Sequence, residues 1–428
     1  MNITRKIAVI GLGYVGLTVA SAFGQISKVV GFDINRKRIG ELNEDNDVNN
    51  EVSINELKSA DIHYTMNPTD LADADFYIIT VPTPVDKFKR PDYSMLSNAS
   101  KIVGNVLKKG DIVVYESTVS PGTTEELCIP ILESVSNLKC GIDFGVGYSP
   151  ERINPADNVH TFKNIIKIVS GNDSETVQQV AATYKLVVTA GVHPVSSIKI
   201  AEAVKVIENT QRDLNISIMN EITMILHKID ICMAEVLAAA ATKWNFISFY
   251  PGLVGGLCMS TNSYLLAHKA QESGCYPEMI LAGRRINEAM PKFIVDHAIT
   301  HLIRSGVSIK HSRIGILGLS FKDNYPSFHD SKVIDIINIL KQYDANVIVH
   351  DPIVDGVLAK EIHDINMVNL ESFTDMDAII VAVAHEQYIG PNKEKIDAIL
   401  CKSKLIVDLR GMLDSNIFDG TATTYWRL

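Results

Sequence analysis

The amino-acid sequence predicts an α/β protein in which a central helical segment joins two doubly wound sheets. Three observations support this prediction. Short apolar runs alternate with helical patterns in the first half of the chain, strand signals disappear in the middle, and the alternation resumes before the C-terminal end. Such alternation is typical of parallel sheets whose two faces are both covered by helices.

Five apolar runs in the first half have the length and composition of buried parallel strands. The runs cover residues 6–10, 29–32, 76–81, 112–115 and 145–148. Together with the helical patterns between them, they assign residues 1–195 to a first domain.

The middle of the chain loses these strand signals. From about 196 to 289 one helical pattern follows another, with an interruption of aromatic, proline and glycine residues near 244–256. We therefore predict a central helical domain at 196–305 and a second, smaller α/β domain at 306–428. The candidate strands of this last domain are 314–317, 347–350, 378–383 and 405–409.

Composition and charge exclude several classes of protein. The 428 residues carry a net charge of −10, which argues against a nucleic-acid partner. The start of the chain lacks the apolar core of a signal peptide, and no stretch reaches the roughly 18 apolar residues of a membrane span. We therefore expect a cytoplasmic protein without a membrane partner. The six cysteines lie far apart without CxxC spacing, which favours neither disulfides nor a metal site.

A glycine-rich turn follows the first predicted strand. Residues 11–16 read Gly-Leu-Gly-Tyr-Val-Gly, a helical pattern begins directly after them, and Asp33 ends the next strand. In such a Rossmann-like unit the first glycine permits a tight turn, and the second lets the backbone approach a pyrophosphate. The third lets helix and strand pack closely. Strand, turn, helix and acidic residue together predict a dinucleotide site.

NAD is the cofactor predicted for this site. The Asp33 carboxylate would accept a hydrogen bond from a ribose 2′-hydroxyl and repel a 2′-phosphate. Arg36, Lys37 and Arg38 lie nearby and leave NADP as an alternative. The predicted cofactor residues are Gly11, Gly13, Tyr14, Val15, Gly16, Asp33, Arg38, Thr83 and Thr118.

Three further turns follow strands of the same domain, at 81–84, 116–119 and 149–152. Taken singly they would be ordinary loops. Because ligands of doubly wound sheets bind beyond the carboxyl ends of the strands, we expect all three turns to line the cofactor site.

A polar stripe follows the helix that begins near residue 196. Glu202, Lys205, Asn209 and Arg212 are spaced three or four residues apart and therefore share one face. Most such stripes are simply solvated, which is the alternative interpretation.

A cysteine follows two glycines in the segment 251–258, which reads Pro-Gly-Leu-Val-Gly-Gly-Leu-Cys. Backbone at glycine approaches a ligand closely, and its amide groups can face a developing oxyanion. A thiolate at Cys258 would attack an aldehyde, whereas the alternative is a small packed core residue.

These motifs, in this order, resemble the UDP-glucose and UDP-N-acetylhexosamine 6-dehydrogenase family. The wording of 206–213 and 251–256 is closest to the branch that acts on N-acetylated sugars. The resemblance therefore implies a substrate such as UDP-N-acetyl-glucosamine, -galactosamine or -mannosamine. It covers essentially the whole chain, through blocks at 11–16, 81–84, 116–119, 149–152, 201–212, 251–258 and 318–322.

The resemblance also implies a four-electron oxidation of the C6 alcohol to a uronic acid for surface polysaccharide, with two NAD consumed per sugar. Cys258 would trap the aldehyde as a thiohemiacetal, and Lys205 with Asn209 would stabilise the oxyanion. Thr118 and Glu151 would handle water and protons. The middle helices would form a homodimer interface, and the last domain would bind the UDP-sugar. The implied substrate-binding residues are Glu151, Arg152, Lys205, Asn209, Gly255 and Lys322.

Four positions depart from the family's pattern. Tyr250, Leu257 and Asn262 stand where the family has Arg, His and Asp. His329 stands where a later Arg is usual. An asparagine cannot act as a general base, and neither Tyr nor a neutral His replaces a bidentate Arg.

Three hypotheses follow for the function. The first is an active nucleotide-sugar 6-dehydrogenase. The second, to which the four departures point, is a catalytically weak or inactive relative that still binds NAD and a nucleotide sugar. The third is an unrelated two-domain NAD dehydrogenase in which Cys258 is merely packed, and the joint presence of Lys205, Asn209 and Cys258 disfavours it.

Overall fold

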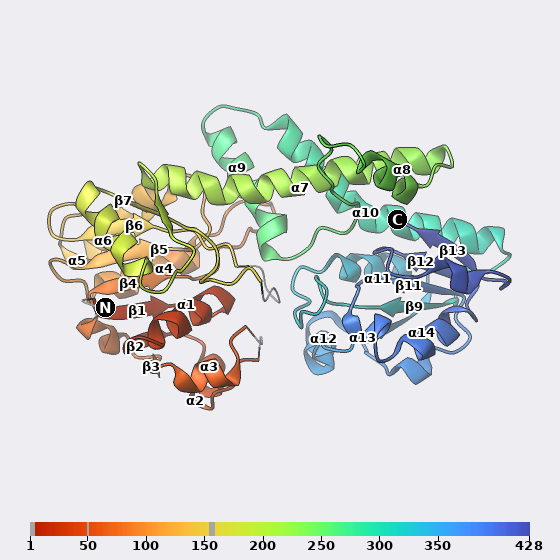
Figure 1. Cartoon of the computed structure of the whole chain (residues 1–428), viewed down its shortest axis with the longest axis horizontal. Helices are drawn as coiled ribbons and strands as arrows, with labels where there is room; N and C mark the ends of the chain where they lie inside the picture. The colour runs from red at the N-terminus through yellow and green to blue at the C-terminus, as the bar shows by residue number, and fades with distance from the viewer. Residues whose placement is uncertain (1–4, 49–50, 154–158) are drawn as a thin grey trace. The chain divides into compact units, whose positions relative to one another are not determined.

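The computed structural model describes the chain except for a few short segments, and Figure 1 shows its path. The described residues are 5–48, 51–153 and 159–428. The helix that contains residues 257 and 258 is described as backbone, whereas the side chains of these two residues lie outside the description. Within the described ranges, no helix is both long and apolar enough to cross a membrane.

The chain divides into two compact units, each with one of the two predicted sheets. The first unit consists of Met1–Asn209 and Thr261–Pro277, and the second consists of Thr210–Ser260 and Glu278–Leu428. The boundaries predicted at 195 and 305 divide the chain into three parts, and that finer division stays a prediction.

The sheet of the first unit has the strand order β3-β2-β1-β4-β5-β6-β7-β8. Its strands are parallel except for the antiparallel pair β6 and β7. Chain order reverses between β1 and β4, which is the switch point where doubly wound sheets bind ligands. The bounds are β1 Ile7–Ile10, β2 Val29–Phe32, β3 Ile62–Thr65, β4 Phe76–Ile79, β5 Ile112–Tyr115, β6 Gly145–Tyr148, β7 Lys167–Gly171 and β8 Val192–Pro194.

Apolar side chains on both faces hold this sheet between two layers of helices. Ile7 and Val9 of β1 belong to one core cluster, and Ala8 and Ile10 belong to the other. Successive strand residues point to opposite faces, so a continuous apolar run serves both layers. The helices are α1 Tyr14–Gly24, α2 Arg36–Asn43, α3 Ile54–Ser59, α4 Ser94–Gly104, α5 Ile129–Ser136 and α6 Ser174–Tyr184.

The middle of the chain is helical, as predicted. The long helix α7 (Ile198–Lys228) continues from the first unit into the second. It is followed by α8 (Met233–Ala240), α9 (Leu257–Glu272) and α10 (Glu278–Arg304).

The sheet of the second unit is entirely parallel, with the order β10-β9-β11-β12-β13. Ala378 and Ile380 of β11 pack in one core cluster, whereas Ile379 and Val381 pack in the other. The predicted fold class, two Rossmann-like domains joined by helices, is therefore confirmed. The bounds are β9 Arg313–Leu317, β10 Asn346–His350, β11 Ala378–Val381, β12 Leu405–Asp408, β13 Thr424–Arg427, α11 Lys332–Gln342, α12 Gly356–His363, α13 Glu386–Ile389 and α14 Lys393–Leu400.

Candidate active site

The glycine turn after β1 has the geometry of a dinucleotide cradle. Gly11 adopts a φ of 93°, and its N–H donates to the carbonyl of Phe32 over 2.8 Å. A Cβ on Gly16 would lie 1.8 Å from the Gly11 oxygen, so only glycine fits there. A Cβ on Gly13 would have no described atom within 4 Å. Gly13 therefore presents bare backbone to open space at the start of α1, where a pyrophosphate would bind.

Asp33 stands at the end of β2 beside this turn. Its Oδ2 accepts a hydrogen bond of 2.7 Å from the N–H of Leu12, and its Oδ1 accepts one of 2.8 Å from Asn35. The carboxylate is only partly buried, which leaves it accessible to a ribose. The residues present thus fit NAD.

The Arg38 side chain is bound to other residues of the protein. Its Nε donates to the Leu12 carbonyl over 2.9 Å, and its guanidinium pairs with Asp47 at 2.8 Å. The residue is 7% exposed. Because the Arg38 guanidinium is already bound to the glycine turn and to Asp47, it is poorly placed to bind a 2′-phosphate. This supports NAD over NADP.

Two of the predicted turns meet through their threonines. The Thr83 hydroxyl, in the turn after β4, donates to the carbonyl of Thr118, in the turn after β5. The Ser117 hydroxyl also donates to the Val81 carbonyl over 2.6 Å. Thr83 and Thr118 therefore lie together at the carboxyl ends of neighbouring strands, whereas Tyr14 and Val15 begin α1 and are half-buried.

A buried charge cluster lies behind these turns. The Nζ of Lys167 is 2.9 Å from a carboxylate oxygen of Glu116 and 2.5 Å from one of Glu151. The Tyr184 hydroxyl donates to the other Glu116 oxygen. All three charged side chains are at least 95% buried. The one signal of this cluster in the sequence is Lys167, a cation at the start of the otherwise uncharged strand β7.

The polar stripe of α7 is buried over its first turns, so it is not a solvated face there. The Glu202 carboxylate accepts from the N–H groups of Gly122 (2.5 Å) and Thr124 (2.8 Å). The Lys205 ammonium donates to the backbone carbonyl of Glu151. Arg212, by contrast, is exposed.

Two asparagine side chains in the first unit carry buried amide atoms for which no hydrogen-bond partner is described. Among the described residues, neither the nitrogen nor the oxygen of the Asn209 amide has a hydrogen-bond partner, and Asn262 Nδ2 has none either. Both residues are 1% exposed. A buried amide without partners is costly, so these groups are poised for a ligand or water. Arg152, a predicted substrate residue, pairs instead with Glu208 at 2.8 Å.

The glycine segment before α9 is fixed within the second unit. The Asn220 side chain accepts from the Gly252 N–H over 2.8 Å and donates to the Gly252 carbonyl over 3.1 Å. A Cβ on Gly255 would lie 2.7 Å from the carbonyl oxygen of Asp330, so backbone packs on backbone there. This segment leads to Cys258, whose side chain lies outside the described residues. Elsewhere, burial raises the pKa of the Cys128 thiol to about 12, which makes that cysteine a poor nucleophile.

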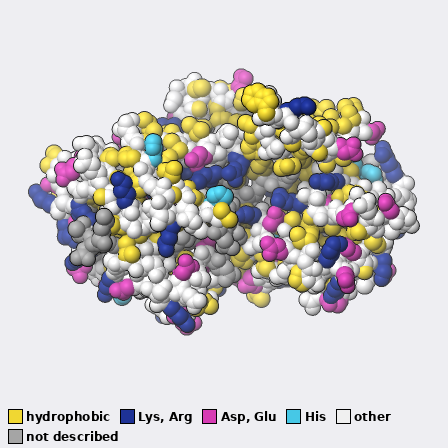
Figure 2. All heavy atoms as spheres, in the orientation of Figure 1, with side chains coloured by type: hydrophobic (Ala, Val, Ile, Leu, Met, Phe, Trp, Pro, Cys, Tyr) yellow, Lys and Arg dark blue, Asp and Glu magenta, His cyan; other side chains and the backbone are white. Residues whose placement is uncertain are grey.

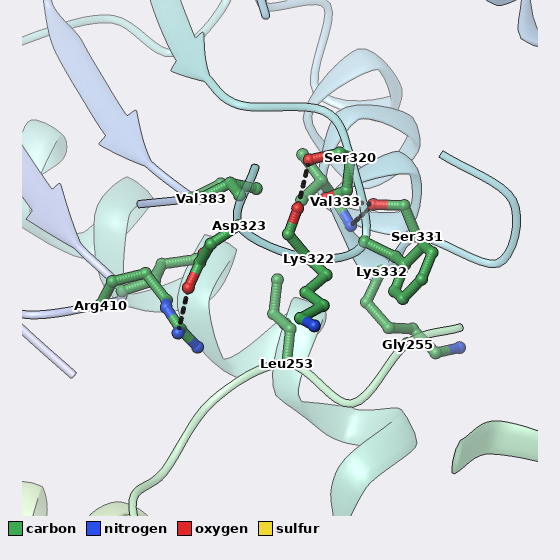
Figure 3. A pocket seen from close by; sticks show the side chains of 13 residues that line it. Leu253, Gly255, Ser320, Lys322, Asp323, Ser331, Lys332, Val333, Val383 and Arg410 are labelled. Carbon is green, nitrogen blue, oxygen red and sulfur yellow. Dashed lines mark hydrogen bonds and ion pairs between the residues drawn. The ribbon is translucent and has the colours of Figure 1, made fainter. Parts of the chain in front are cut away.

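A pocket in the second unit gathers basic side chains. Gly255 and Lys322, both predicted to bind substrate, line it together. Figure 3 shows the Lys322 side chain in the middle of the view, with Arg410 on its left and Lys332 on its right. Arg410 is held by Asp323 at 2.6 Å. Sequence reasoning missed Lys332 and Arg410, because each is an isolated cation beside an apolar element.

Tyr250 and His329, which also depart from the family's pattern, lie on the surface of the second unit. Tyr250 is 65% exposed, and the His329 ring stacks on Phe328 with centroids 5.6 Å apart.

Comparisons with known proteins agree with this geometry. Residues 5–188 match the NAD binding domain of the UDP-glucose/GDP-mannose dehydrogenase family, 199–289 its central domain and 315–415 its UDP binding domain. The chain is 50% identical to the protein CapL of Staphylococcus aureus, over 99% of this chain and 100% of CapL. It is 46% identical to a UDP-N-acetyl-D-glucosamine 6-dehydrogenase of Pseudomonas aeruginosa, over 97% and 98% of the two chains.

A solved structure is similar along its whole length. The UDP-D-ManNAc dehydrogenase of Pyrococcus horikoshii matches with a TM-score of 0.86 and 28% identity, over 99% of this chain and 98% of that one.

Proposed function

Because the chain belongs to the UDP-glucose/GDP-mannose dehydrogenase family of NAD-dependent oxidoreductases, we propose that it oxidises the C6 alcohol of a UDP-N-acetylhexosamine to the uronic acid. The product would serve surface polysaccharide synthesis, and the reaction would take place in the cytoplasm. The observation that carries the proposal is the joint presence of the open Gly13 cradle and the basic pocket around Lys322.

In this proposal, residues of the first unit bind NAD. Bound NAD supplies the hydride acceptor. Gly13 would lie against the pyrophosphate, and Asp33 would hold the ribose hydroxyl. The joined turns at Thr83 and Thr118 would border the nicotinamide side of the same sheet edge.

In this proposal, residues of the second unit bind the UDP part of the substrate. A diphosphate carries negative charges that Lys322, Lys332 and Arg410 would compensate. Lys332 is itself paired with Glu288 at 2.7 Å and with Asp335 at 3.1 Å, and Arg410 is paired with Asp323 at 2.6 Å, so a bound diphosphate would share these cations with protein carboxylates.

The chemical steps follow from the residue types. The Cys258 thiolate would add to the C6 aldehyde, giving a thiohemiacetal whose oxidation yields a thioester that water hydrolyses. Lys205 and Asn209 would donate to the oxygen that becomes negative in these steps. Their burial, at 6% and 1% exposed, strengthens such hydrogen bonds.

The test is NADH formation at 340 nm with the purified protein and a panel of UDP-sugars. We expect about two NADH per sugar consumed with an N-acetylated substrate, as the thioester route requires. A second candidate, a relative that binds both ligands with little turnover, is favoured by Asn262, whose amide replaces the family's carboxylate. Binding of both NAD and a UDP-sugar without NADH formation from any sugar would establish that candidate and overturn the first.

We further propose a homodimer formed through the second unit. Figure 2 shows hydrophobic side chains gathered over the region of α8. Such a contiguous apolar surface is typical of an interface. A change of Ile225 to Glu should therefore convert a dimer to a monomer in light scattering, and a wild-type monomer would contradict the proposal. The exposed apolar residues of this unit include Ile218, Ile225, Ile229, Ile231, Val236, Trp244 and Ile247.

A further inference from the structure

We infer that His385 is a positioning residue for nucleotide binding, because its ring holds the loop 319–324, which carries Lys322 into the basic pocket. His385 lies in the turn between β11 and α13 and is 1% exposed. It acts on the ligand through the loop rather than by contact. The inference rests on the proposed function, in which Lys322 compensates charge on a diphosphate.

The loop 319–324 is bound to the protein on both sides of Lys322. On one side, the Ser320 hydroxyl donates to the Lys322 carbonyl over 2.9 Å, as Figure 3 shows. On the other side, the Asn324 N–H donates to Nδ1 of His385 over 3.0 Å. The Asn324 side chain in turn accepts from the Glu386 N–H over 2.9 Å. The backbone of Lys322 is therefore held between two anchors, and one of them is the His385 ring.

The backbone of Asn324 shows why this anchor matters. Its φ of 57° lies in the left-handed region, which residues other than glycine adopt only where their surroundings hold them. The preceding Asp323 accepts from the Ala384 N–H over 3.0 Å and pairs with Arg410. The loop therefore depends on its contacts with the turn 384–386 for its shape.

The hydrogen bonds determine which nitrogen of His385 carries the hydrogen. Nδ1 faces a backbone N–H, so it must accept and carries no hydrogen. Nε2 lies 3.1 Å from the Asp351 carboxylate and 3.2 Å from the Ser320 hydroxyl, whose own hydrogen is donated to Lys322. Nε2 therefore donates, and His385 is a neutral ring with its hydrogen on that nitrogen.

The two nitrogens of His385 thus have separate roles. Nδ1 holds the loop 319–324, whereas Nε2 bonds to Asp351, which holds the turn after β9. Two amide side chains can replace one nitrogen each. The amide oxygen of asparagine can take the place of Nδ1, and the amide nitrogen of glutamine can take the place of Nε2.

The first experiment compares UDP binding to His385→Asn and His385→Gln by isothermal titration calorimetry, together with their melting temperatures. We expect His385→Gln to weaken UDP binding about fivefold or more, because the Asn324 N–H loses its acceptor. His385→Asn should bind UDP within about twofold of wild type. Its melting temperature should be the lower of the two, because it removes a donor from the buried Asp351 carboxylate.

A merely structural role for His385 predicts the reverse order, in which the less stable variant binds UDP less well. The control is His350→Asn, which removes another histidine of the same unit, whose Nδ1 lies 2.9 Å from the Tyr388 hydroxyl. UDP affinity should be unchanged in this control, and NAD affinity should be unchanged in all three variants. Equal UDP affinities in His385→Asn and His385→Gln, or weaker binding by His385→Asn, would overturn the inference.

A second measurement separates this inference from the proposed function. Deuterium exchange of residues 319–325 in the ligand-free protein, followed by mass spectrometry, reports how firmly the loop is held, whether or not the protein binds UDP. We expect severalfold faster exchange in His385→Gln and nearly wild-type exchange in His385→Asn. Equal exchange in the two variants would overturn the positioning role, while failure of the proposed function would show as absent UDP binding by the wild type.

Discussion

Asp33 and Asp351 make the same backbone contact in the two sheets. Each carboxylate accepts a hydrogen bond of 2.7 Å from the N–H of the leucine that follows the turn glycine, Leu12 in one case and Leu319 in the other. The two turn glycines, 11 and 318, have φ values of 93° and 94°. The second sheet thus repeats the nucleotide turn of the first.

The Asp351 carboxylate, however, is fully engaged in contacts within the protein. Asp351 is 6% exposed, and it also accepts from the N–H groups of Ser320, Ile353 and Val354. The His385 Nε2 lies 3.1 Å from it. Asp351 therefore holds a structural turn, whereas the partly exposed Asp33 is left for a ribose.

The first prediction contrasts these two aspartates. Asp33→Asn should raise the KM for NAD about tenfold, since a hydrogen bond to a charged group contributes about 1.5–3 kcal/mol. Asp351→Asn should lower the melting temperature more than Asp33→Asn does, because Asp351 accepts from four backbone N–H groups and Asp33 from two. Steady-state kinetics and thermal unfolding of both variants check this, and an unchanged KM in Asp33→Asn would contradict it.

The second prediction contrasts two glycines of the turn. Gly13→Val should keep the melting temperature but weaken NAD binding, because the added side chain points into open space that the pyrophosphate needs. Gly16→Ala should lower the free energy of unfolding by about 1–3 kcal/mol, since its Cβ would collide with the Gly11 oxygen. Urea unfolding and NADH fluorescence titration measure the two effects. Equal losses of stability in both variants would contradict this account.

The third prediction concerns the nucleophile. Cys258→Ala should abolish net acid formation and leave NAD binding intact, because no thioester can form. The readout is NADH per UDP-sugar consumed. Cys275→Ala, at an exposed cysteine, is the matched control. Full activity in Cys258→Ala would show that the thiohemiacetal role is wrong.

The fourth prediction concerns the amide at position 262. Asn262→Asp should raise turnover, because it restores a carboxylate that can accept a proton where the amide cannot. Asn105→Asp, on the surface of the same unit, controls for added charge. A rate in Asn262→Asp that is unchanged or lower than wild type would show that this position does not limit the reaction.

The fifth prediction is a loss of stability in acid caused by His297. Burial lowers the pKa of His297 to about 3, and the neighbouring His227 adds to the effect. An unfolded histidine titrates near about 6.5, so the unfolded state binds more protons below that pH. The contribution is present above about pH 6.5 and declines towards pH 3, by up to about 1.4 kcal/mol per pH unit.

His297→Asn should flatten this decline in urea unfolding between pH 7.5 and 5. His193→Asn, at an exposed histidine, should not. The same acid sensitivity in His297→Asn as in wild type would refute the assignment.

The sequence by itself determined the parts of the fold that depend on local pattern. The strands at 29–32, 112–115 and 145–148 are where the apolar runs predicted them, because a strand buried on both faces needs uninterrupted apolar residues. The turn at Gly11 was also predictable, since its backbone geometry demands glycine at fixed spacings. Strands β3, β7, β8 and β13 were missed, because their polar, aromatic, glycine and proline residues give no long apolar run.

Only the tertiary structure decided which polar groups are buried and what they meet. Lys205 and Arg212 look alike on the α7 stripe, yet one is enclosed against the Glu151 carbonyl and the other is exposed. Lys167 and Glu116 are 51 residues apart and become partners only because β5 and β7 belong to one sheet. Burial and charge pairing depend on contacts between distant segments, and the spacing of residues along the chain does not encode those contacts.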